Sequence, residues 1–209
     1  MIISLLKNMR TFHHTPKGKY THISKPFGGF ERGHKKKKQT SHLMRYLKIV
    51  PGTSVDGPGL RTSVYFAGCS HHCHGCHNEH SWDFMGGEQI APEALLQKLL
   101  ENEEPVTLSG GDPLQQPHDE LLALLKGLKA HNVNVWCFTG YTFEQLLTNR
   151  QHKELLGYID VLVDSPFVLA QRDTTLRFRG STNQRILDVK ASLAVSCPVL
   201  TPYQESPIL

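Results

Sequence analysis

The chain has 209 residues, of which 39% are hydrophobic, and its mean hydropathy is −0.33. These values are typical of a soluble protein with one buried core, and the lack of a long apolar run argues against a membrane-spanning segment. No cleavage signal follows the short apolar start, and five cysteines are an odd number, so we expect a reduced, cytoplasmic protein without a disulfide framework. The formal net charge of +4 hides an uneven distribution, because residues 1–43 contain ten Lys and Arg and one acidic residue, whereas the remainder is mildly acidic.

The first 43 residues lack a hydrophobic period and include four consecutive lysines at 35–38. Such a composition buries too little apolar surface to offset the entropy of ordering, which predicts a disordered basic extension. A basic arm of this kind could bind nucleic acid or another polyanion. The alternative that we favour is a dispensable extension, with Met44 as the true start, because the composition changes sharply there.

The ordered part is predicted to begin with a strand over residues 44–50. Turn residues follow over 51–59, where Asp-Gly and Pro-Gly pairs break regular structure. A second strand, over 61–67, is rich in Thr, Val, Tyr and Phe, and it leads directly into a loop rich in Cys and His.

Beyond that loop, helices and strands alternate. In chain order we predict a helix over 92–103, a strand over 106–109, a helix over 119–130, a strand over 133–138, a helix over 143–156 with a break near 148–149, and strands over 158–163 and 186–189. Residues 191–209 contain three prolines and are expected to form an extended C-terminal tail. The alternation indicates βαβ units, with too few repeats for an eight-fold barrel. We therefore expect an α/β fold over residues 44–190, a partial, open β/α barrel of five or six parallel strands.

The loop rich in Cys and His carries Cys69, Cys73 and Cys76, three of the five cysteines within eight residues. Clustered thiolates are soft ligands that suit zinc or an iron–sulfur cluster. Three is an incomplete set, since a closed zinc site needs four ligands and an ordinary four-iron cluster takes four cysteines. Either one iron is left open for chemistry, or a nearby histidine completes a zinc site. The candidate histidines are His71, His72, His74, His77 and His80.

Other residues suited to chemistry follow later predicted strands. They are Gly110-Gly111-Asp112, Thr139-Gly140-Tyr141 and Asp164. Because sites in parallel sheets gather where strands end, we expect these residues to converge with the cysteines on one face. A bare Gly-Gly backbone also lets a small ligand approach main-chain groups closely. A structural zinc site has no need of such a second loop, so the pattern favours the open iron.

As a set, these residues resemble the radical S-adenosylmethionine enzymes. Within that superfamily, the chain is similar to the activating proteins of anaerobic ribonucleoside-triphosphate reductase, which generate glycyl radicals. Besides the cysteines, the matching motifs are Asp56-Gly57-Pro58-Gly59 with Arg61, Gly75 before the third cysteine, Ser109-Gly110-Gly111-Asp112-Pro113, Thr139-Gly140-Tyr141, and the segments 163–167 and 179–185. The resemblance covers residues 44–190.

The resemblance implies that Cys69, Cys73 and Cys76 hold a 4Fe–4S cluster and that S-adenosyl-L-methionine chelates the fourth iron. One electron from a flavodoxin-type donor would cleave the sulfonium reductively to methionine and a 5′-deoxyadenosyl radical, which would take a hydrogen from a glycine on the large subunit of the reductase. The residues implied for cosubstrate binding are Gly75, His77, Gly110, Gly111 and Asp112. Asp112 could instead cap the following helix. Further candidates are Asp164, Arg179 and Arg185, the arginines for the partner or the cosubstrate carboxylate.

Two other functions stay open at this point. The chain could activate another glycyl-radical enzyme of the pyruvate formate-lyase type, although its length after Met44 and its motif at 179–185 argue against that. It could also be a zinc-stabilised nucleic-acid-binding module that uses the lysines at 35–38, whereas an activase needs no nucleic acid for its core domain. Iron and sulfide of about four per chain would indicate the cluster, and colourless protein with one zinc would indicate the module.

Overall fold

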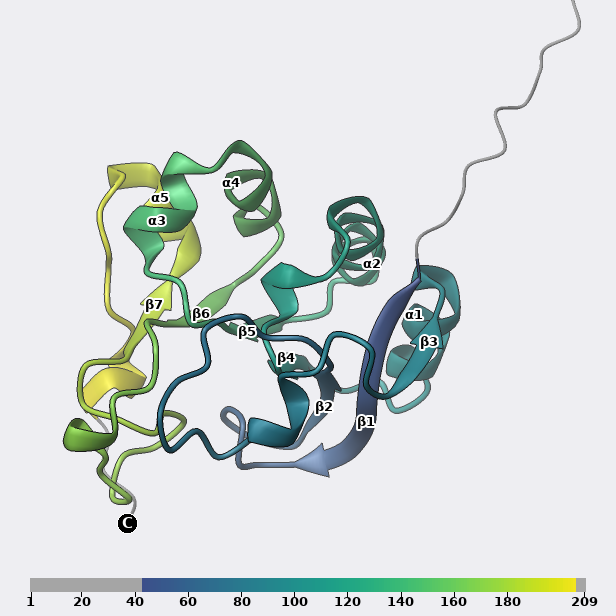
Figure 1. Ribbon diagram of the computed structural model, residues 1–209. Helices are drawn as coiled ribbons and strands as arrows, with labels where there is room; N and C mark the ends of the chain where they lie inside the picture. The colour runs from purple at the N-terminus through teal and green to yellow at the C-terminus, as the bar shows by residue number, and fades with distance from the viewer. Residues whose placement is uncertain (1–42, 206–209) are drawn as a thin grey trace, which may run out of the picture. The chain divides into compact units, whose positions relative to one another are not determined.

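Seven strands form one sheet in the computed structural model, which describes residues 43–205. They are β1 (Met44–Thr53), β2 (Arg61–Phe66), β3 (Glu88–Ile90), β4 (Val106–Gly110), β5 (Val135–Phe138), β6 (Val161–Asp164) and β7 (Arg185–Asp188). Their order across the sheet is β3-β1-β2-β4-β5-β6-β7, so the sheet is open (Figure 1). The predicted disordered extension over residues 1–43 lies outside the described residues, apart from Leu43 at its end.

The predicted α/β class and the open sheet are confirmed, but the expectation of five or six parallel strands is wrong. Only the neighbouring pairs β2–β4, β4–β5 and β5–β6 are parallel, whereas β1 pairs antiparallel with β2 and β3, and β7 pairs antiparallel with β6. The short connection between β1 and β2 explains why these two strands are antiparallel. A parallel crossover needs a dozen or more residues, and only residues 54–60 join these strands. β3 escaped prediction since it has three residues, of which only Ile90 is buried.

Side chains alternate between the two faces of the sheet. Val135 and Cys137 belong to the large core that the helices cover, whereas Trp136 between them packs with Val163 and Ile186 on the opposite face. This period of two is what an extended strand imposes. The central strands are therefore buried on both sides, as parallel strands are.

Five α-helices and four short 3-10 helices are present in residues 43–205. The α-helices are α1 (Pro92–Leu100), α2 (His118–Ala130), α3 (Phe143–Thr148), α4 (Arg150–Leu156) and α5 (Val189–Val195); the 3-10 helices are η1 (Glu79–Ser81), η2 (Pro113–Gln115), η3 (Leu169–Gln171) and η4 (Pro202–Glu205). The predicted break near 148–149 is confirmed, because the Asn149 side chain accepts a hydrogen bond from the His152 amide at 3.1 Å and caps α4. Nothing helical in this part of the chain combines the length and the apolarity that crossing a bilayer requires.

The chain after residue 190 was expected to form an extended tail, but its residues up to Val195 belong to α5, and Pro202–Glu205 form η4. The Asp188 carboxylate accepts a hydrogen bond from the Ala191 amide at 2.9 Å, and the Ser192 hydroxyl donates to the Asp188 carbonyl at 2.6 Å. The first contact caps α5, and the second is a bond from a helical serine to the carbonyl four residues before it. The sequence has no apolar period that predicts this short helix. Leu200 then forms a β-bridge with Leu187, which returns the chain to the sheet.

Candidate functional site

A cavity of about 350 Å³ lies where the parallel strands end. The loops that follow β2, β4, β5 and β6 form its wall, which is the usual place for a site in a parallel sheet. The residues predicted to hold a cluster or the cosubstrate that line it are Cys69, Cys73, Cys76, His77, Gly110 and Gly111. Further residues that the sequence singled out also line it, among them His71, Thr139, Gly140 and Arg179. Ser165 and Phe167, from the matching segment 163–167, line it as well. Lining residues that the sequence did not single out include Val55, Asn78, Phe138 and Leu176. Phe138 could have been found from its position at a strand end, whereas nothing in the sequence marks Val55 or Leu176.

The cysteine loop, residues 67–78, is anchored to the chain that follows it. The Gly68 amide donates to the Ser81 carbonyl at 2.7 Å, and the Cys69 amide donates to the Trp82 carbonyl at 3.1 Å. Cys69 is 9% exposed, and all three cysteines of the loop are free thiols. The loop therefore presents three unpaired sulfurs to one cavity.

Burial favours the protonated form of two of these thiols. It raises the pKa of the Cys69 thiol to about 11 and also raises the pKa of the Cys73 thiol. These two thiols thus keep their protons at neutral pH unless a metal cation replaces the protons. Thiolates are the ligands that iron–sulfur clusters take, and three thiols face this one cavity.

The histidines of the loop make contacts of their own. His71 Nε2 is 2.7 Å from Asp112 Oδ2, and the ring centroid of His77 lies 5.6 Å from that of Phe167. In residues 43–205, no three Cys, His, Asp or Glu side chains are placed to hold a single metal ion. A cluster makes a different demand, since each cysteine binds its own iron. The separate thiols fit a cluster on these grounds.

The structure explains why the two residues at the end of β4 are glycines, which the sequence alone did not. Gly110 has a φ of +104°, and a Cβ there would lie 2.4 Å from the Phe66 amide nitrogen. A Cβ on Gly111 would lie 2.4 Å from the Gly68 carbonyl oxygen. Both positions therefore require glycine so that β4 can end against the start of the cysteine loop. The same bare main chain lines the cavity.

Asp112 is 1% exposed, and it is not among the residues that line the cavity. Its Oδ1 atom accepts a hydrogen bond from the Leu114 amide at 2.9 Å, which caps η2. Its Oδ2 atom accepts from the Thr139 hydroxyl at 2.9 Å and the Gly140 amide at 3.1 Å, and lies 2.7 Å from His71 Nε2. The capping alternative is thus present, and direct cosubstrate binding by this carboxylate stays a prediction.

The remaining predicted residue, Gly75, lies beside the cavity and does not line it. Its φ is +74°, and a Cβ there would lie 3.0 Å from Leu169 Cδ1. Glycine is therefore required by the backbone turn before Cys76 and by the packing of η3 against it.

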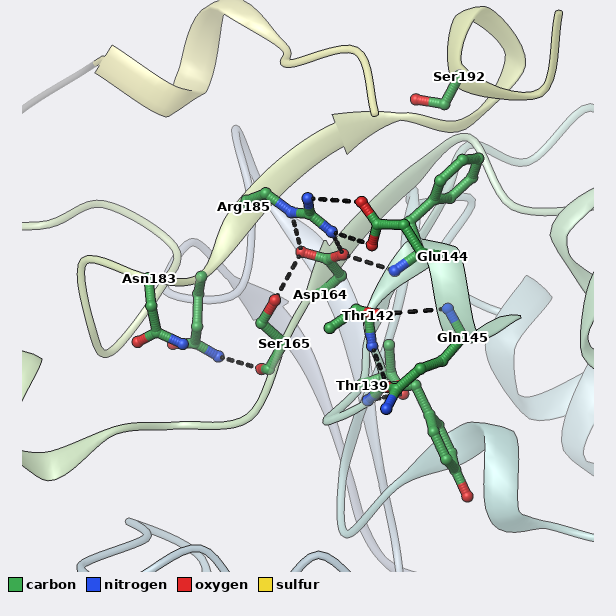
Figure 2. A network of polar contacts seen from close by, with 12 residues as sticks. Thr139, Thr142, Glu144, Gln145, Asp164, Ser165, Asn183, Arg185 and Ser192 are labelled. Atoms are coloured by element: carbon green, nitrogen blue, oxygen red, sulfur yellow. Dashed lines mark hydrogen bonds and ion pairs between the residues drawn. The ribbon is translucent and has the colours of Figure 1, made fainter. Parts of the chain in front are cut away.

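The three further candidates lie in polar networks that hold the fold. Asp164 is fully buried, and its carboxylate accepts from the Arg185 guanidinium and from the Phe143 amide (Figure 2). Arg185 also donates to both carboxylate oxygens of Glu144, at 3.0 and 2.8 Å. Arg179 donates to three main-chain carbonyls, those of Thr182, Gln184 and Gln204. Both arginines therefore have partners within the chain, and Arg179 also lines the cavity.

Comparison with known proteins agrees with the motifs. The family model described as "4Fe-4S single cluster domain" matches residues 55–187. The chain is similar to the anaerobic ribonucleoside-triphosphate reductase-activating proteins of Haemophilus influenzae and Vibrio cholerae, each 36% identical over 152 residues, which cover 68% of this chain and 97% of the relative. The protein of the same name from Enterobacteria phage T4 is 34% identical over 150 residues, covering 68% of this chain and 93% of the relative. The resemblance inferred from the sequence is confirmed.

Proposed function

Because the chain belongs to the family of anaerobic ribonucleoside-triphosphate reductase-activating proteins, we propose that it activates this reductase by generating a glycyl radical on its large subunit. The proposed cofactors are a 4Fe–4S cluster and S-adenosyl-L-methionine. One observation carries the proposal: three free thiols and the main chain of two adjacent glycines line the same cavity.

The cysteines and the glycines have separate tasks in this proposal. Cys69, Cys73 and Cys76 hold the cluster and leave one iron without a protein ligand. When bound, the cluster supplies one electron to the sulfonium of S-adenosylmethionine, whose bond to the ribose carbon then breaks to give methionine and a 5′-deoxyadenosyl radical. The main chain of Gly110 and Gly111 lies along the methionine part of the cosubstrate, because no side chain separates it from the cavity.

The adenine side of the cosubstrate is assigned to the end of the cysteine loop. His77 and Phe167 both line the cavity, with ring centroids 5.6 Å apart. Flat rings of this kind offer a stacking surface for a base. Gly75 contributes through the backbone turn that places Cys76 and His77.

The partner has to bring its glycine to the open side of the cavity. Val55, which lines the cavity, is 68% exposed, and Leu169, which packs over Gly75, is 42% exposed. Exposed apolar side chains beside a site mark an interaction surface. We assign this rim to the reductase, the electron to a flavodoxin-type donor, and the reaction to the reducing cytoplasm that free cysteines favour.

Anaerobic purification followed by iron, sulfide and 5′-deoxyadenosine assays tests the proposal. We expect brown protein with about four irons and four sulfides per chain, and 5′-deoxyadenosine formation after reduction with S-adenosylmethionine present. Cys73→Ala is expected to lose the cluster and all cosubstrate cleavage, because one of three ligands is removed. Cys197→Ala is the matched control, since Cys197 is exposed and does not line the cavity.

The same preparation separates the competing functions. A glycyl radical detected by electron paramagnetic resonance on the anaerobic reductase, and not on pyruvate formate-lyase, supports the proposed target. The reverse result would move the activity to another glycyl-radical enzyme. Colourless protein with one zinc, or a normal cluster in Cys73→Ala, would contradict the proposal.

A further inference from the structure

Asp112 joins three segments that are far apart in the sequence. Its carboxylate contacts His71 from the cysteine loop, 41 residues away, and Thr139 from the loop after β5, 27 residues away. The Gly140 amide and the Leu114 amide complete its partners. A carboxylate with so many donors in a buried position holds their geometry tightly, since each lost partner leaves a buried polar atom unpaired.

The contact with His71 matters because of where His71 lies. It stands between Cys69 and Cys73, and its ring centroid is 4.6 Å from that of Tyr141 in an edge-to-face arrangement. A Cβ on Gly140 would lie 2.4 Å from His71 Cδ2, so any side chain larger than that of glycine at this position would clash with the ring. The imidazole is thus held between Asp112, Gly140 and Tyr141. Because His71 lies between Cys69 and Cys73 in the chain, fixing its ring also fixes the backbone that connects these two cysteines.

Asp112 itself is shielded from the cavity. It is 1% exposed and does not line the cavity, whereas Gly110, Gly111 and Thr139 around it do. A ligand in the cavity therefore meets the main chain of the two glycines before it could meet the carboxylate. Any influence of Asp112 on that ligand has to pass through the loops that it holds.

We propose that Asp112 is a positioning residue that ties the cysteine loop and the loop after β5 to the end of β4, and that it acts on the cluster and on S-adenosylmethionine without touching either. The proposal rests on the proposed function, because it assigns Asp112 a role in that same site. It differs from a direct contact between this carboxylate and the amino group of the cosubstrate.

The test uses the anaerobically purified full chain with its iron–sulfur cluster, in wild-type form and as Asp112→Asn. Asparagine keeps the shape of the side chain but replaces one acceptor oxygen with an NH2 group, so it cannot satisfy the same donors. We expect Asp112→Asn to retain iron and to show an altered electron paramagnetic resonance spectrum of the reduced cluster before any cosubstrate is added. We also expect the Kd for S-adenosylmethionine to rise about tenfold, because the loops that Asp112 no longer holds must be ordered again when the cosubstrate binds.

Asp160→Asn is the matched control at the other end of the sheet. Asp160 precedes β6, accepts from the Val135 amide at 2.7 Å and pairs with Lys129. This variant removes a carboxylate that also accepts a main-chain hydrogen bond but lies far from the cysteine loop and is 36% exposed, against 1% for Asp112. It is expected to lower the unfolding temperature and to leave the spectrum and the Kd unchanged.

A second pair of variants keeps the proposal testable if Asp112→Asn does not fold. Thr139→Val removes the hydroxyl that donates to Asp112 but keeps the carboxylate and the volume, whereas Thr139→Ser retains the hydroxyl. Because Thr139 itself lines the cavity, this pair is read by the spectrum of the reduced cluster before any cosubstrate is added. We expect Thr139→Val to change that spectrum in the same direction as Asp112→Asn, and Thr139→Ser to keep the wild-type spectrum.

Two results would overturn the proposal. An unchanged spectrum without cosubstrate, combined with a raised Kd, would show that Asp112 contacts the ligand directly. An Asp112→Asn protein that loses only thermal stability, as Asp160→Asn is expected to do, would show a purely structural role. Failure of the wild-type protein to bind a cluster would instead contradict the proposed function, so the two failures are distinguishable.

Discussion

Asp112 and Asp164 are two buried carboxylates at the same edge of the sheet, and they are stabilised in different ways. Asp164 faces the Arg185 guanidinium, which supplies a full positive charge and is itself shared with Glu144. The partners of Asp112 are two amides, one hydroxyl and the ring of His71. Among the residues that the structure describes, neither a lysine nor an arginine forms an ion pair with Asp112.

The two aspartates also differ in the parts of the fold that their hydrogen bonds connect. The Asp164 network joins β6, β7 and the start of α3, which belong to the sheet and its helical cover (Figure 2). The Asp112 network joins loops that line the cavity. The comparison predicts that damage to the first network lowers stability and damage to the second alters the site.

The largest stability effect is expected for Arg185→Met. This substitution leaves the Asp164 carboxylate buried without its cation, and breaking a buried ion pair from one side costs about 3–5 kcal/mol. Urea denaturation without oxygen measures the loss, and the electron paramagnetic resonance spectrum of the reduced cluster is expected to stay as in wild type. If the free energy of unfolding fell by less than about 1 kcal/mol, or if the spectrum changed, the proposed difference between the two networks would be wrong.

An intermediate effect is expected for Gly140→Ala on the Asp112 side. The new Cβ would lie 2.4 Å from the His71 ring, so the ring must turn away from Asp112. Overpacking of this kind costs about 1–3 kcal/mol, and the displaced ring is expected to alter the cluster spectrum as well.

Gly180→Ala is the matched control for that substitution. A Cβ at Gly180 would lie 3.1 Å from the Phe167 ring, which needs to shift by only a few tenths of an ångström. We expect a stability loss below about 1 kcal/mol. If the two alanine variants prove equally stable and Gly140→Ala keeps the wild-type spectrum, the His71 ring is not held in the way described.

The cysteine site and most of the sheet could be predicted from the sequence because their signals are local. Three cysteines within eight residues, a Gly-Gly pair after a buried strand and the period of two in residues such as Val135 and Trp136 need no knowledge of distant contacts. The break at Asn149 could be predicted for the same reason, since a capping residue acts on the three residues that follow it.

The contacts of the two aspartates could not be predicted, because their partners are distant in the sequence. Asp112 reaches His71 over 41 residues, and Asp164 reaches Arg185 over 21. A local pattern shows only that an aspartate follows a strand, which describes both residues equally well. The sequence therefore placed both at the site's edge, and only the fold distinguishes a carboxylate paired with arginine from one held by amides and hydroxyls.

The smallest effect is expected for Glu144→Gln, and it depends on pH. The Arg185 guanidinium lowers the pKa of the Glu144 carboxyl from 4.5 to about 2. A carboxyl whose pKa is depressed by folding stabilises the protein above the pKa of the unfolded chain, and this contribution is lost as pH falls from 4.5 towards 2. Because the Glu144 side chain is 55% exposed, solvent screens the pair and its contribution is about 0.2–1 kcal/mol. The difference in urea midpoint between wild type and Glu144→Gln, measured at each pH so that other groups cancel, should therefore be present at pH 6 and shrink below pH 4.5. A difference that stays constant across this range would show that Arg185 stabilises the fold through Asp164 alone.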